Sequence, residues 1–303
     1  MKDETSSRGP FIGLSQYVRM TNTCKKTGCD LKIIVNADDL GESLPINGAI
    51  RRYACDGLIS SASLLPNGPG FEDALKVVRD CDDLSIGAHL NLTQFSSLSR
   101  SPVLVDAGIT DENGCFTGAA KWNSSSRLSF DRSTSEAVYE EWRLQLTKLY
   151  DCKISITHID GHNHVHYYYR FMPIIKRLQK QFGIKRIRIR DVKPITFYGF
   201  FNSSLEKKMP PLDRQVSNLI WNCLLKAIPP RTMTVNHVFS YLSLCRYLST
   251  GSRCPKRGVF EVVAHPGSDY LSYFAEENRL IERRRIHDLI PKFKLISYRD
   301  LEY

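Results

Sequence analysis

Short apolar runs alternate with amphipathic stretches of helical length along most of the chain, and this alternation limits the fold more than any other feature. The apolar runs resemble buried parallel strands, predicted at 31–37, 59–65, 84–92, 154–159, 187–190, 259–264 and 294–297. Helices are predicted at 45–55, 71–78, 135–150, 171–182, 205–228 and 276–290. Such alternation indicates parallel strands joined by right-handed crossovers. The sequence therefore predicts an α/β fold of mainly parallel strands, and the number of units favours closure into a barrel.

The first thirty residues are rich in Ser, Thr and Lys and lack a continuous apolar run. We therefore expect a loosely ordered extension at 1–30 and one folded domain at 31–303. A long polar, Gly- and Ser-rich stretch at 96–133 is expected to form an insertion over one end of the sheet.

Composition excludes several classes of partner. The 303-residue chain has a formal net charge of +10, but its Lys and Arg residues are scattered and no nucleic-acid-binding motif accompanies them. No run approaches the roughly 20 apolar residues of a membrane helix. The nine cysteines are odd in number and irregularly spaced, as expected for reduced thiols. We expect an intracellular, cytoplasmic protein with no nucleic-acid or membrane partner, and a homodimer is left open.

Polar residues follow the predicted strands where parallel α/β folds gather their chemistry, at the carboxyl ends. The first strand ends in Asp38 and Asp39, followed closely by Gly41. Adjacent residues on an extended strand point to opposite faces, so the two acids reach one site only if the backbone turns, as a glycine permits. Taken alone, they could equally be solvated turn or helix-cap residues.

Histidines end three other strands. His89 lies near the end of the third strand, His265 precedes Pro266 and Gly267, and 158–166 contains four of the chain's eight histidines, with Asp160 among them. At strand spacing, the alternating residues of 158–166 would share one face, which suits metal binding. A lone histidine is more often a buried hydrogen-bonding residue, and the cluster could be a polar loop. One shared site nevertheless accounts for all four strand ends together.

The segments that carry these residues resemble the motifs of the YdjC-like carbohydrate deacetylases, in the same order. The motifs are Asn36-Ala37-Asp38-Asp39-Leu40-Gly41, Gly87-x-His89-x-Asn91-Leu92, Thr157–His166 and Ala264-His265-Pro266-Gly267. The resemblance implies an irregular (β/α) barrel, similar to other polysaccharide deacetylases, with 31–303 as the catalytic domain. One departure is Leu40, where the family usually has Phe, and it affects a wall of the substrate site.

The resemblance also assigns roles. It implies that Asp39, His89 and His162 bind a divalent metal ion, with Asp38 as the catalytic base. It places His265 at the position of the acid. We expect Asp160, Arg188 and His164 beside these residues. In this scheme Asp160 orients His265 or another histidine, while Arg188 holds a sugar hydroxyl or orients Asp38.

The expected reaction is removal of acetyl groups from N-acetylated sugars of the chitooligosaccharide type. Metal-bound water would attack the amide, Asp38 would accept a proton, and His265 would protonate the leaving nitrogen. The family is usually assigned magnesium, whereas an Asp-His-His set also suits zinc. The alternatives are another metal-dependent hydrolase, such as a phosphoesterase or amidohydrolase, and a non-catalytic sugar-binding barrel.

Overall fold

The computed structural model describes residues 30–122, 131–190, 212–249, 257–268, 272–283, 286–290 and 292–302. The expectation for the N-terminal extension lies outside these ranges. Parallel strands form the centre of the molecule, in the spatial order β4-β3-β2-β1-β6-β5, and β7 also pairs with β1. The strands are β1 (Asp30–Leu40), β2 (Ser61–Leu64), β3 (Ser85–Leu90), β4 (Ile156–Gly161), β5 (His237–Ser240), β6 (Arg257–Ala264) and β7 (Lys294–Leu295).

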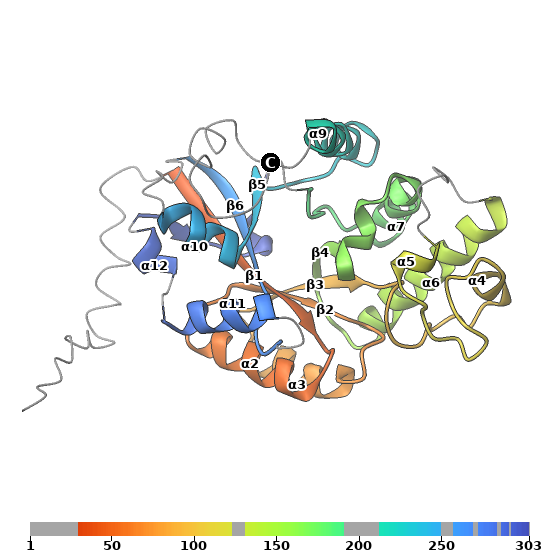
Figure 1. Ribbon diagram of the computed structural model, residues 1–303, viewed down its shortest axis with the longest axis horizontal. Coiled ribbons are helices and arrows are strands. Elements are labelled where there is room, and N and C mark those ends of the chain that lie inside the picture. Colours follow the sequence, from red (N-terminus) through yellow and green to blue (C-terminus); the bar gives the residue numbers. More distant parts are fainter. Residues whose placement is uncertain are drawn as a thin grey trace, which may run out of the picture.

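Helices flank this curled sheet. They are α2 (Leu44–Cys55), α3 (Phe71–Asp80), α4 (Pro102–Asp106), α5 (Ala119–Trp122), α6 (Arg132–Asp151), α7 (Met172–Phe182), α9 (Leu212–Ala227), α10 (Tyr241–Ser249), α11 (Ser272–Arg283) and α12 (Ile286–Leu289). Figure 1 shows α2, α3 and α11 on one side of β1, and α6 and α7 together beyond β3 and β4. Within the described ranges, every helix is too short or too polar to cross a lipid bilayer.

Local sequence explains the first crossover. In β1, Ile33, Ile34 and Val35 are all buried, as expected for a strand covered on both faces. The following helix, α2, begins after Ser43, whose Oγ accepts a hydrogen bond from the Ile46 amide at 3.5 Å. The apolar side of α2 then packs into the core, and the chain returns to β2.

The predicted barrel is irregular because its sheet continues beyond β4 through isolated bridges. Ile159 of β4 pairs with Ile187, and Arg186 pairs with Met233, just before β5. Among the described residues, the segment 187–190, predicted as a strand, contributes one isolated bridge, Ile159–Ile187, and no regular strand. The Asn222 side chain explains its end, since it accepts a hydrogen bond from the Arg190 amide and donates one to the Arg190 carbonyl, both at 3.0 Å. We call residues 185–188 and Met233 the seam of the barrel.

The structure differs from the predicted elements in two further places. The helix predicted at 276–290 corresponds to α11 and α12, and α11 begins earlier than predicted. Of the helix predicted at 205–228, the part before α9 lies outside the described residues. Strand β5 and helix α10 were not predicted, because β5 has only four residues and runs directly into α10.

Candidate metal and catalytic site

The end of β1 turns so that two adjacent carboxylates serve one site. Asp39 has a left-handed backbone (φ 68°), and Gly41 has φ 91°. The Glu42 amide donates to the Asp39 carbonyl at 3.0 Å, which closes the turn. A left-handed aspartate is uncommon and is typical of positions held for function. Asp38 and Asp39 are both almost fully buried, and their carboxylates face neighbouring partners on β3 and β4.

Asp39, His89 and His162 converge at the carboxyl ends of three strands. The Asp39 Oδ1 atom lies 2.8 Å from His162 Nδ1 and 3.3 Å from His89 Nε2. The two imidazole rings meet edge to face, with centroids 5.4 Å apart. One potential ligand atom from each residue lies within 4.8 Å of the other two. We call these three residues the Asp39 group.

The outer nitrogen of each histidine faces an acceptor. His89 Nδ1 lies 2.7 Å from Asp160 Oδ1, and His162 Nε2 lies 2.8 Å from Gln94 Oε1. An acceptor fixes the hydrogen on the outer nitrogen and leaves the inner nitrogen of a neutral ring as a ligand. The inner nitrogens, together with Asp39, therefore form the two-nitrogen, one-oxygen donor set that suits a divalent cation.

The carboxylates around the Asp39 group favour a positive charge at this site. Burial alone would lower the pKa of His89, but the Asp160 and Asp39 carboxylates raise it to about 10. Burial would raise the pKa of Asp39, but His162 and His89, in the protonated form that donates hydrogen bonds from their inner nitrogens, hold it well below its ordinary value. The residues present thus fit a bound cation in both donor type and electrostatic balance.

A second polar cluster lies beside the first, around a buried guanidinium. Arg188 donates to both oxygens of Asp38, at 2.7 and 2.8 Å, and lies 2.7 Å from both Asp160 and Glu261. Burial would raise the pKa of Asp38, but Arg188 outweighs it and the pKa falls below its usual value. Burial dominates at Glu261 and raises its pKa to about 7. We call Arg188, Asp38, Asp160 and Glu261 the Arg188 cluster.

His265 follows β6 and is held by a glutamate that the sequence analysis did not single out. Its Nδ1 lies 3.0 Å from Glu277 Oε2, and its amide donates to the same oxygen at 2.9 Å. Burial lowers the pKa of His265, but the Glu277 carboxylate more than compensates and the pKa is raised. Asp160 was expected to orient either His265 or another histidine. It contacts His89, and Glu277 is the carboxylate beside His265.

The histidines of 158–166 do not share one face, because the strand ends at Gly161 and a turn follows. His158 lies on the same face as Asp160, with its Nε2 3.9 Å from Asp160 Oδ2, but it is not part of the Asp39 group and stacks on Tyr298, with ring centroids 3.7 Å apart. Its burial lowers its pKa to about 3. His164 is exposed and stacks on Tyr167, whereas His166 is buried. Of the four histidines in 158–166, which are all among the described residues, only His162 belongs to the Asp39 group.

Three residues of the site were missed by sequence analysis, and two of them had a detectable signal. Glu261 is the charged residue within the buried, apolar part of strand β6, which marks a partnered buried group. Glu277 lies between Phe274 and Ile281 at helical spacing, on the buried side of α11. Gln94 lies in a loop and has no comparable signal.

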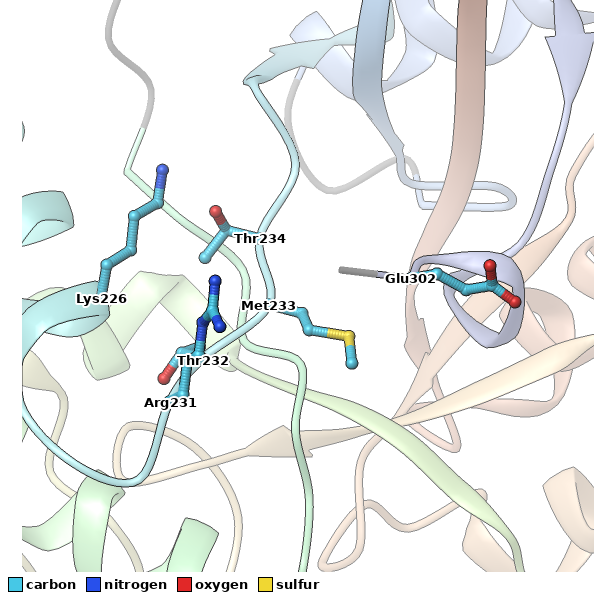
Figure 2. A pocket seen from close by; sticks show the side chains of 6 residues that line it. All are labelled: Lys226, Arg231, Thr232, Met233, Thr234 and Glu302. Atoms are coloured by element: carbon cyan, nitrogen blue, oxygen red, sulfur yellow. The ribbon is translucent and has the colours of Figure 1, made fainter.

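A separate cavity of about 430 Å³ lies near the end of α9, away from these clusters. Its lining residues are Lys226, Arg231, Thr232, Met233, Thr234 and Glu302. Figure 2 shows that the Glu302 carboxylate points away from Lys226 and Arg231. The cavity therefore offers no convergent set of catalytic groups.

Comparison with known proteins identifies relatives of this chain. Proteins named carbohydrate deacetylase match it at 34% identity in Brevibacillus brevis, 26% in Vibrio parahaemolyticus and 29% in Geobacillus stearothermophilus. These matches cover 51%, 63% and 57% of this chain, and 58%, 72% and 69% of the respective relatives. The chain thus spans little more than half the length of the Brevibacillus protein.

A solved structure has the same fold. It is the crystal structure of a protein from Enterococcus faecalis V583 described as a cellobiose-phosphate cleavage protein, with a TM-score of 0.67 and 21% identity. The similarity covers 90% of this chain and 100% of that one, which supports the α/β half-barrel architecture. The model of the family described as YdjC-like protein matches residues 32–290, which is most of the chain. The chain therefore belongs to the YdjC-like protein family.

Proposed function

We propose that this protein is a metal-dependent carbohydrate deacetylase that hydrolyses the acetamide of N-acetylated sugars of the chitooligosaccharide type. The observation that carries the proposal is the convergence of Asp39, His89 and His162 beside a buried carboxylate, Asp38, and a tethered imidazole, His265. The names of the relatives in Brevibacillus, Vibrio and Geobacillus supply the substrate class.

Asp39, His89 and His162 would hold the divalent ion. When bound there, such an ion polarises the acetyl carbonyl and stabilises negative charge on its oxygen. The two imidazole nitrogens favour a zinc-type ion. The magnesium expected from the family resemblance stays a prediction.

Asp38 is proposed as the general base. Its Oδ1 accepts hydrogen bonds from Asn36, at 2.8 Å, and from Arg188, whereas its Oδ2 accepts only from Arg188 among the described residues. A carboxylate oxygen can accept two hydrogen bonds, so Oδ2 has a lone pair for the proton of an attacking water. Arg188 keeps the carboxylate ionised and fixed, which prepares it to accept that proton.

His265 is proposed as the general acid. Glu277 accepts from Nδ1 and raises the pKa, so the ring stays protonated to higher pH than a free histidine. The protonated ring can then deliver a hydrogen to the departing nitrogen, which must leave as an amine. Asp38 and Asp39 act on His265 electrostatically, which supports a shared role for the proposed acid and base in one reaction.

The proposal is tested by measuring acetate release from N-acetylglucosamine oligomers, with the protein first stripped of metal and then reloaded with zinc or magnesium. We expect turnover only with metal. Asp38→Asn should lower kcat by about 10²- to 10⁴-fold, the typical contribution of general base catalysis, and leave metal affinity near wild type. Normal turnover by Asp38→Asn would show that Asp38 is not the general base.

The same assay separates the alternatives. Phosphate release from phosphoesters without acetate release would assign the site to a phosphoesterase. Oligosaccharide binding without turnover of any tested ester or amide would identify a sugar-binding barrel. The intracellular location and the homodimer are separate predictions, tested by fractionation of cells and by sedimentation.

A further inference from the structure

We propose that Gln94 is a positioning residue that selects Nδ1 of His162 as the atom facing the cation. The inference rests on the proposed metal site but not on the substrate or the reaction. It assigns opposite nitrogens to the two histidines, Nε2 for His89 and Nδ1 for His162. Gln94 enforces this difference through its side-chain carbonyl.

The distances define the two orientations. His162 lies between two oxygens, with Nε2 2.8 Å from Gln94 Oε1 and Nδ1 2.8 Å from Asp39 Oδ1. A carbonyl oxygen can only accept a hydrogen bond, so Gln94 requires a hydrogen on Nε2. In the neutral ring, which is the form that binds a cation, Nδ1 then carries the lone pair beside Asp39. His89 has the reverse arrangement, with Nδ1 directed at Asp160 and Nε2 directed at Asp39.

The loop that carries Gln94 is held firmly by its own polar residues. The Gln94 carbonyl accepts hydrogen bonds from the side-chain amides of Asn91, at 2.7 Å, and Asn67, at 3.2 Å. Asn91 is anchored to α6, since its carbonyl accepts from Trp142 and Gln145. Gln94 therefore presents its side chain from a fixed backbone, as an orienting residue requires.

A second contact ties the Gln94 loop to the His162 turn. The Asn163 side chain donates to Thr93 Oγ1 at 3.0 Å. Asn163 and His164 both have left-handed backbones, with φ 50° and 57°. Such conformations are costly for residues other than glycine and are kept where the surroundings fix them. This turn directs the edge of His162 that carries Nε2 towards Gln94.

The two histidines also differ in the charge of their partners. Asp160 is a carboxylate and makes His89 a strong electron donor, whereas Gln94 is a neutral amide and has a weaker effect. The donor strength of His162 can therefore be adjusted by changing Gln94 alone. A carboxylate at this position keeps the acceptor, and an aliphatic side chain removes it.

The test compares Zn²⁺ affinity of the full chain with that of Gln94→Leu, Gln94→Glu and Ser96→Ala, by competition with a chromophoric chelator. Gln94→Leu should weaken Zn²⁺ binding by about 10- to 100-fold, as is usual when the partner of a ligating histidine is lost. Gln94→Glu should bind at least as tightly as wild type. Ser96 is exposed on the same loop, and its Oγ contacts only Cys115 among the described residues, so Ser96→Ala should not change the affinity.

Nitrogen-15 NMR of the histidine side chains in the Zn²⁺-loaded wild type gives an independent readout. We expect the hydrogen of His162 on Nε2 and Zn²⁺ on Nδ1. Zn²⁺ on Nε2, or wild-type affinity in Gln94→Leu, would overturn the proposal. If Gln94→Leu does not fold, the NMR assignment and Gln94→Glu still decide. Acetate release is not measured, so failure of the proposed deacetylase activity would leave this result standing.

Discussion

The Asp39 group and the Arg188 cluster are neighbours of similar composition but opposite electrostatic design. Both are buried, and Asp160 contacts both, through His89 and through Arg188. In the Arg188 cluster a guanidinium donates to the surrounding carboxylates, so the chain supplies the cation. In the Asp39 group a carboxylate meets the inner nitrogens of two imidazoles. One cluster is therefore complete on folding, whereas the other is suited to a cation taken from solution.

The largest effect is expected when the cation that the chain supplies, the Arg188 guanidinium, is removed. Arg188→Met leaves Asp38, Asp160 and Glu261 buried without their shared partner. We expect a loss of about 3–5 kcal/mol in the free energy of unfolding, measured in urea at pH 7 without metal.

Arg177 provides the matched control, because it forms an exposed ion pair with Glu136 at 2.6 Å. Arg177→Met should cost less than about 1 kcal/mol. Equal losses in the two variants would show that the Arg188 cluster does not stabilise the folded chain more than a surface pair does.

The next largest effect tests the cluster that takes its cation from solution. Asp39→Asn removes the carboxylate between His89 and His162, and we expect Zn²⁺ affinity to fall by about 100-fold or more. Titration calorimetry measures the affinity, and Asp38→Asn is the control with an equally buried carboxylate outside the group. Similar losses in both variants would mean that the two clusters bind metal as one unit.

A smaller effect concerns the pH range of the reaction. Glu277 raises the pKa of His265, so the protonated acid persists above the ordinary histidine pKa and is lost as pH rises through the raised value. Glu277→Gln removes this charge and should move the alkaline limb of the kcat profile about one unit lower. An unchanged alkaline limb would contradict the assignment of His265 as the acid.

The smallest effect concerns the edge of the Arg188 cluster. Tyr298 donates a hydrogen bond to Glu261 Oε2 at 2.5 Å. Since Arg188 still contacts Glu261, Tyr298→Phe should cost only about 1 kcal/mol of unfolding free energy in urea. A loss as large as that of Arg188→Met would show that the hydroxyl, and not the guanidinium, dominates this cluster.

Much of the fold could be predicted from the sequence because buried parallel strands have a distinct apolar signature. The run that becomes β1 and the amphipathic pattern of α2 are examples, and the α/β half-barrel is confirmed. The seam was harder to predict. Ile187 is a residue type typical of strands, but the side chain of Asn222 ends the backbone pairing nearby. That competition between side chain and backbone becomes apparent only when distant segments meet.

The residues of the candidate site could be predicted where they lie at or directly after the end of a strand. Asp38, Asp39, His89 and His162 all lie at or just after strand ends, and the structure brings them together. Asp160, the partner of His89, was expected beside a histidine, whereas Gln94 and Glu277 were not, because Gln94 comes from a loop and Glu277 from the helix that follows β6. Strand periodicity also failed at Gly161, after which the left-handed turn separates His162 from His164.

The irregular seam has a consequence for how this protein responds to heat or mild denaturant. Arg188 belongs to a strip joined to β4 by the Ile159–Ile187 bridge, whereas β1 and β6 are paired over eight positions. Transient parting of that strip would pull the guanidinium from Asp38 while most of the barrel stays intact. Local opening of the seam would then limit how long the protein stays active. On heating, the turnover rate should therefore decline before circular dichroism detects loss of secondary structure.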